Sequence, residues 1–117
     1  NTIGILPDQI RIDCIKQMFE CSGPGGKLVI GCWNQQSLGQ ALKISIQKIL
    51  NFAVVKEEDF DFESGDFKCG SSDYTSHWWK QEELQKMLEE SFPGFIEDLK
   101  IEFKIIGVGI FAICDIK

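Results

Sequence analysis

Basic residues and long apolar runs are both scarce in this sequence. Its 117 residues hold 12 lysines and arginines against 18 aspartates and glutamates, so the net charge is −6. Nonspecific binding to nucleic acid and attraction to anionic membranes both depend on clustered Lys and Arg, and we therefore expect neither partner. No apolar run approaches the roughly 20 residues that a membrane-spanning helix requires.

Cysteine pairs with metal-binding spacing are also lacking. The five cysteines are Cys14, Cys21, Cys32, Cys69 and Cys114, and no two of them form a Cys-x-x-Cys pair. An odd number without such a pair predicts neither a disulfide framework nor a zinc site. Three of the five lie inside apolar segments, which is typical of small buried side chains. A reducing cytoplasm is the expected compartment, and no metal is expected.

What the sequence does contain is typical of one small globular domain. Hydrophobic residues make up 44% and charged residues 26%, so a packed core is expected. The chain begins at Asn1, without a methionine and in what reads as the end of a strand passing into a loop over residues 1–6. We expect that a segment upstream of it is missing.

Residues 23–34 form the centre of the predicted fold. Pro24 and the glycines around it end one helix and reverse the chain. The apolar run 28–30 does not alternate with polar residues, which predicts a strand covered on both faces. Ligands of open α/β sheets bind at the carboxyl ends of strands, so Trp33 and Asn34 are candidate binding residues. A packing tryptophan and a turn asparagine are the alternative interpretation.

Hydrophobic periodicity predicts the other elements. Helices are expected over 8–21, 36–51 and 81–91, and strands over 27–32, 99–107 and 108–116. The stripe of the first helix consists of Ile12, Ile15, Met18 and Phe19, widened by Ile10 and Cys14. Alternation of helix and strand predicts an α/β fold with a parallel sheet, whose last two strands are joined by a tight antiparallel turn.

An acidic segment with alternating phenylalanines lies between these elements. Residues 60–62 and 67–69 flank a Ser-Gly-Asp turn signal and predict a hairpin. Asp59, Asp61 and Glu63 would share one strand face. Their spacing is not that of a calcium loop, so a solvated strand face is expected.

Several motifs in this order point to a known family. They are Asn-Thr-Ile-Gly-Ile-Leu-Pro at 1–7, Pro-Gly-Gly-Lys-Leu-Val-Ile at 24–30, the aromatic segment 74–79 and the terminal hairpin. Together they resemble the C-terminal half of a class I S-adenosylmethionine (SAM) dependent methyltransferase, in particular the small-molecule N-methyltransferases of the glycine and sarcosine type. The resemblance covers essentially the whole chain.

The resemblance implies the C-terminal half of a Rossmann-like α/β sheet with an antiparallel terminal β-hairpin. Strand 27–32 would be the fifth strand of the family pattern and 99–107 the sixth. The seventh, 110–116, would be inserted between them. Residues 1–117 would form a single, partial methyltransferase domain with an insertion at about 56–79. The glycine-rich loop and acidic residue that hold SAM in the family have no counterpart in this sequence. The chain alone is therefore expected to bind SAM poorly and to be inactive by itself.

The resemblance also implies roles for the residues around the cleft. Asn1 and Thr2 would follow the fourth strand and contact the cofactor, although Asn1 also suits a loop cap. Trp33 and Asn34 would bind substrate at the end of the fifth strand.

The aromatic segment would cover the substrate. Tyr74, Trp78 and Trp79 are the candidate substrate-binding residues, because aromatic faces attract a sulfonium or ammonium group. His77, the sole histidine, is the candidate catalytic base. A structural histidine that caps the following helix is the alternative.

Two functions of different classes follow. The first is a SAM-dependent methyltransferase half that transfers a methyl group to a small-molecule acceptor. The second is a noncatalytic interaction module derived from the same half-fold. Its exposed sheet edge would be covered by a second copy or by the missing N-terminal half.

Overall fold

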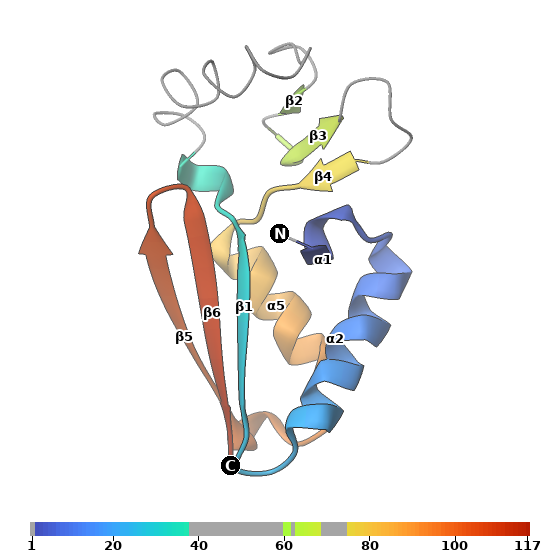
Figure 1. Cartoon of the computed structure of the whole chain (residues 1–117), viewed down its shortest axis with the longest axis vertical. Coiled ribbons are helices and arrows are strands. Elements are labelled where there is room, and N and C mark those ends of the chain that lie inside the picture. Colours follow the sequence, from blue (N-terminus) through green and yellow to red (C-terminus); the bar gives the residue numbers. More distant parts are fainter. Residues whose placement is uncertain (1, 38–59, 62, 69–74) are drawn as a thin grey trace.

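The computed structural model describes residues 2–37, 60–61, 63–68 and 75–117. These residues form an α/β arrangement with a three-stranded sheet, two longer helices and a second small sheet at one end (Figure 1). The helical elements are α1 (Thr2–Ile5), α2 (Asp8–Ser22), the 3-10 turn η1 (Gln35–Ser37), α5 (Gln81–Ser91) and the 3-10 turn η4 (Ile96–Asp98). The strands are β1 (Lys27–Trp33), β2 (Phe60–Asp61), β3 (Asp66–Lys68), β4 (Thr75–His77), β5 (Leu99–Ile106) and β6 (Gly109–Ile116).

The larger sheet has the strand order β1-β6-β5. Its middle strand β6 runs antiparallel to both neighbours, so β1 and β5 run in the same direction. The predicted insertion of the last strand between the other two is thereby confirmed. The prediction of a parallel sheet is wrong for the described ladders, because the hairpin turn at Gly107, with φ +58, sends β6 back along β5.

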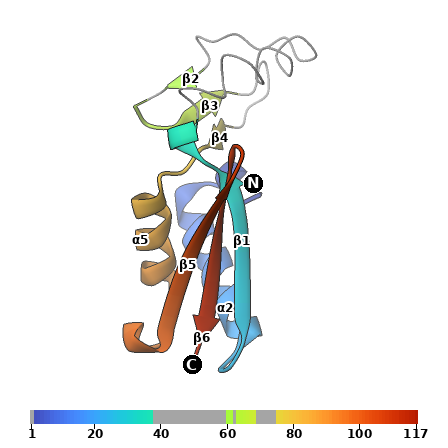
Figure 2. The same ribbon diagram turned by 90° about the vertical axis from the view of Figure 1, so that its left-hand side faces the viewer.

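Both longer helices cover the same face of this sheet. In Figure 2 the sheet faces the viewer, with α2 behind its strands and α5 to the side of β5. Burial along β1 alternates accordingly, with Ile30 and Cys32 buried while Val29 is 56% exposed. The prediction that β1 is covered on both faces is therefore wrong within the described residues, since an apolar run alone does not show how many faces are covered.

The core lies between the sheet and these two helices. Phe19 of α2 packs edge-to-face on Phe92, with ring centroids 5.2 Å apart. On α5 the apolar stripe of Leu84, Met87 and Leu88 faces this core. The fully buried members of the core are Ile15, Leu84, Leu88, Ile110, Ala112 and Cys114, all at 0% exposure.

The predicted helix over 8–21 is confirmed, but its buried stripe is narrower than expected. Gly23 ends α2 with φ 67 and donates its backbone N–H to the Phe19 carbonyl. Ile10 and Ile12 are exposed, contrary to the prediction. The reason is geometric, because the described part of the chain packs against only one side of α2. The predicted helix over 36–51 falls almost entirely outside the described residues.

The expected strand end at 1–6 is instead the short helix α1. Two carbonyls of α1 accept hydrogen bonds from the Arg11 side chain of α2. The guanidinium donates to the Ile3 oxygen at 2.6 Å and to the Gly4 oxygen at 3.1 Å. Carbonyls at the end of a helix lack intrahelical partners, so these bonds stabilise the turn. None of the helices that the structure describes is both long and apolar enough to cross a membrane.

The second sheet has the order β2-β3-β4, with both ladders antiparallel, which confirms the predicted hairpin where it is described. Asp61 accepts hydrogen bonds from the Glu63 and Ser64 amides. These bonds lower the pKa of Asp61. Glu63 belongs to the turn, so its predicted place on a strand face is wrong. Asp59 lies outside the described residues.

The cysteines differ in burial, and this predicts their reactivity. Burial raises the pKa of Cys32 to about 12 and that of Cys114 to about 11, whereas Cys21 is exposed. Relative to a thiol with the ordinary pKa of 9.0, Cys32 therefore has a thiolate fraction on the order of a thousandfold smaller.

We expect iodoacetamide at pH 8 to alkylate Cys21 in the native protein and to leave Cys32 and Cys114 unmodified until urea is added. Peptide mass spectrometry after timed quenching checks this. Equal labelling of Cys21 and Cys114 without denaturant would contradict the described burial. Cys69 lies outside the described residues.

Candidate functional site

The carboxyl end of β1 meets the segment that leads into α5. Asn34 and Trp79 form an isolated parallel bridge. The Trp79 amide donates to the Trp33 carbonyl at 2.8 Å, and the Gln35 amide donates to the Trp79 carbonyl at 2.8 Å. These bonds bring together most of the residues that the sequence singled out, namely Trp33, Asn34, His77, Trp78 and Trp79.

Trp33 and Trp78 form a stacked pair in this cluster. Their ring centroids are 5.5 Å apart and their planes differ by 24°. Trp78 is buried, and its amide donates to the Gly65 carbonyl at 2.8 Å, which joins the cluster to the turn of the small sheet. Trp33 is 41% exposed, so it presents aromatic surface at the end of β1. Such a surface attracts a cationic group.

Asn34 is buried and bonded within the protein. Its backbone N–H donates to the Val108 carbonyl at 2.8 Å, and its side-chain oxygen accepts from the backbone N–H of Gln36 at 3.2 Å. Bonds of this kind hold a turn in shape. The geometry therefore favours the interpretation of Asn34 as a turn residue.

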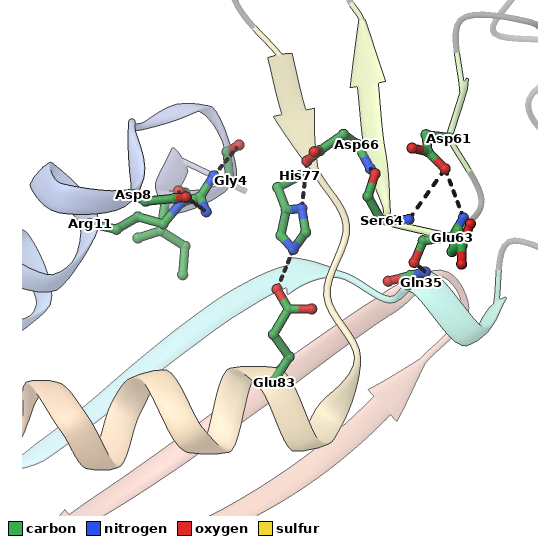
Figure 3. A network of polar contacts seen from close by, with 11 residues as sticks. Gly4, Asp8, Arg11, Gln35, Asp61, Glu63, Ser64, Asp66, His77 and Glu83 are labelled. Carbon is green, nitrogen blue, oxygen red and sulfur yellow. Dashed lines mark hydrogen bonds and ion pairs between the residues drawn. The ribbon is translucent and has the colours of Figure 1, made fainter.

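His77 lies between two carboxylates from different elements (Figure 3). Its Nδ1 is 2.7 Å from the Asp66 carboxylate on β3, and its Nε2 is bonded to the Glu83 carboxylate in the first turn of α5. The imidazole also meets the Trp79 ring edge-on at 4.5 Å. Because both nitrogens are bonded to carboxylates, a base that accepts a proton from substrate would first have to release one of them.

Arg11 is a member of the site that the sequence did not reveal. Its guanidinium lies 4.9 Å from the centroid of the Trp79 ring. It also pairs with Asp8 at 2.8 Å, in addition to its bonds to α1. Arg11 thus fixes α1, α2 and Trp79 relative to one another, and its side chain is only 11% exposed.

Two hollows border this cluster, and Asp8 and Arg11 line both of them. One, of about 350 Å³, reaches Asp66, and the other, of about 260 Å³, reaches Glu83 and Trp79. The remaining residues of the first are Ile5, Leu6, Pro7 and Thr75, and those of the second are Ile12, Lys86, Met87 and Glu90. The two carboxylates that bind His77 therefore border different hollows, Asp66 the first and Glu83 the second.

The other predicted site residues are less informative. Thr2 is exposed at the start of α1. Asn1 and Tyr74 lie outside the described residues, so their assigned roles stay predictions. Within the described ranges, no group of three or more His, Cys, Asp or Glu side chains is placed to hold a metal ion.

Arg11, Asp66 and Glu83 were missed for one reason. Each reaches the cluster from a different element, and neither periodicity nor a turn signal shows such contacts. The short separation of His77 and Glu83 across a helix start is the one local signal that could have found a partner.

Comparison with known proteins gives no relative for this cluster. A scan against models of protein families finds no match, and neither the curated proteins nor the solved structures match the chain.

Proposed function

We propose that this chain is the substrate-side half of a cytoplasmic SAM-dependent methyltransferase that transfers a methyl group to a small-molecule acceptor. The observation that supports this most is the strand order β1-β6-β5, with the reversed strand in the middle. The resemblance implies this order, and hydrophobic periodicity alone does not specify it. The chain would form one partial domain, with the small sheet β2-β3-β4 inside the insertion at about 56–79.

The position of the aromatic cluster also supports this proposal. Trp33, Trp78 and Trp79 gather where β1 ends, which is where ligands of open α/β sheets bind. Methyl transfer is a displacement at the sulfonium methyl group, so the protein has to align the acceptor with the donor. The exposed face of Trp33 suits a cationic sulfonium or ammonium group.

The residues present fit one end of SAM. Trp33 would lie near the sulfonium, which supplies the methyl group when the cofactor is bound. After β1 the chain enters the buried Asn34 turn, and after β5 it enters a tight hairpin turn. Neither turn is a glycine-rich loop leading into a helix, the feature that holds phosphates or adenosine in related folds. Groups that hold the adenosine would therefore come from other residues.

Calorimetric titration with S-adenosylhomocysteine tests the proposal. We expect the complete polypeptide encoded by the gene to bind this product at micromolar strength, and the 117-residue chain alone to bind it far more weakly. The same polypeptide should transfer tritium from methyl-labelled SAM to glycine or sarcosine used as probes. A complete polypeptide that neither binds the product nor transfers label would overturn the proposal.

A noncatalytic interaction module is the second candidate function. Among the described strands, β1 is paired on one side only, and the sheet face away from the helices exposes Val29 and Ile106. Open edges and exposed apolar side chains favour association. A dimer in sedimentation equilibrium, together with no binding of S-adenosylhomocysteine, would favour this candidate over the methyltransferase.

A further inference from the structure

The sole histidine of the chain connects three elements. His77 belongs to β4, Asp66 to β3 and Glu83 to α5, and Figure 3 shows the imidazole between the two carboxylates. The His77 side chain is about one-tenth exposed, while the carboxylates are each about half exposed. The imidazole is therefore the buried centre of an ionic bridge between the small sheet and the helix.

The number of ring protons decides whether this bridge holds. A neutral imidazole has one N–H donor and one acceptor nitrogen, whereas an ionised carboxylate only accepts. Both contacts are hydrogen bonds when the ring carries two protons, and both are then charge-assisted. When one proton leaves, a nitrogen lone pair faces Asp66 or Glu83 and that contact becomes repulsive.

We propose that His77 is a pH-sensitive latch that fastens the small sheet β2-β3-β4 to α5. The small sheet needs such a fastening, because its described strands are only two or three residues long. Trp78 and Trp79 follow His77 directly in the chain, so the latch also determines how these rings lie at the end of β1. It is closed while the ring carries both protons and opens when one of them leaves.

Charged groups face the imidazole from elements packed around β4. Asp66 faces it from β3 and Glu83 from α5. From α2, Arg11 contacts the same Trp79 ring as the imidazole, and Asp8 pairs with Arg11. Among side chains, imidazole is the one that ordinarily changes charge between pH 5 and 8.

Composition makes this latch easy to observe. The chain has one histidine and three tryptophans, and all three tryptophans belong to the cluster. We expect the tryptophan emission of the wild-type chain to pass through a transition between pH 5 and 8. His77→Gln should lose it, while a titrating terminal amine would act equally in both proteins. This experiment needs no cofactor, so its outcome is separate from that of the proposed methyl transfer.

A second pair of variants keeps the histidine in case His77→Gln does not fold. In Glu83→Gln the side-chain amide can accept from a protonated nitrogen or donate to a neutral one, so we expect at least half of the transition to be lost. Glu82→Gln removes the same charge from the same helical turn without touching His77, and should retain the full transition. A wild-type emission that is flat from pH 5 to 8, or equal transitions in Glu83→Gln and Glu82→Gln, would overturn the latch.

Discussion

Replacing Trp79 with alanine is expected to lower the free energy of unfolding by about 3–5 kcal/mol, the usual cost of deleting a buried aromatic ring. Trp79 is only 2% exposed and is the largest fully buried side chain described. Its ring also contacts both Arg11 and His77. Urea denaturation followed by far-UV circular dichroism measures this loss without depending on the deleted fluorophore.

Trp33→Ala and Trp79→Phe are the matched controls, one at an exposed site and one that keeps most of the buried ring volume. Trp33→Ala removes the same side chain from a 41% exposed site and should cost about 0.5–1.5 kcal/mol, the range for one aromatic pair. Trp79→Phe should recover most of the stability. No acceptor for the Trp79 indole N–H lies among the described residues, and an unmade buried hydrogen bond is itself costly. Equal losses in Trp79→Ala and Trp33→Ala would show that Trp79 is not a core residue.

Local signals account for much of the fold. The helix over 81–91 was predicted to its exact bounds, because Phe92 and Pro93 interrupt a clear stripe. The hairpin of β5 and β6 follows from glycines placed between two β-rich runs. The short helix α1 was missed because four residues are too few to show a period, and its end is stabilised by Arg11 from another helix.

Predicting the strand order and predicting the site residues required different kinds of information from the sequence. Periodicity alone predicted parallel neighbours, and only the family resemblance implied that the last strand lies between the other two. Trp78 and Trp79 could be placed beside β1 from their position in the chain. The carboxylates that bind His77 could not be identified from the sequence. Asp66 and Glu83 are not neighbours of His77 in the chain, and only the fold brings them into contact with it.

Alanine at Gly65 is expected to cost about 2–4 kcal/mol, from backbone strain and a lost hydrogen bond together. Gly65 has φ +81, and an added Cβ would lie 2.5 Å from the Trp78 carbonyl oxygen. That oxygen belongs to the backbone, so it cannot rotate away. The substitution should therefore break the 2.8 Å bond from the Trp78 amide to the Gly65 carbonyl.

Gly25→Ala is the matched control, since Gly25 has φ +78 but nothing within 4 Å of an added Cβ. It should cost only the strain of a positive φ, about 1–2 kcal/mol. Tryptophan emission distinguishes the two variants further. Only Gly65→Ala should change the emission of the native state, because it loosens the small sheet from Trp78 while α2, α5 and the larger sheet stay folded. A native emission unchanged in Gly65→Ala, with stability equal to that of Gly25→Ala, would mean that the small sheet does not determine how Trp78 packs at the end of β1.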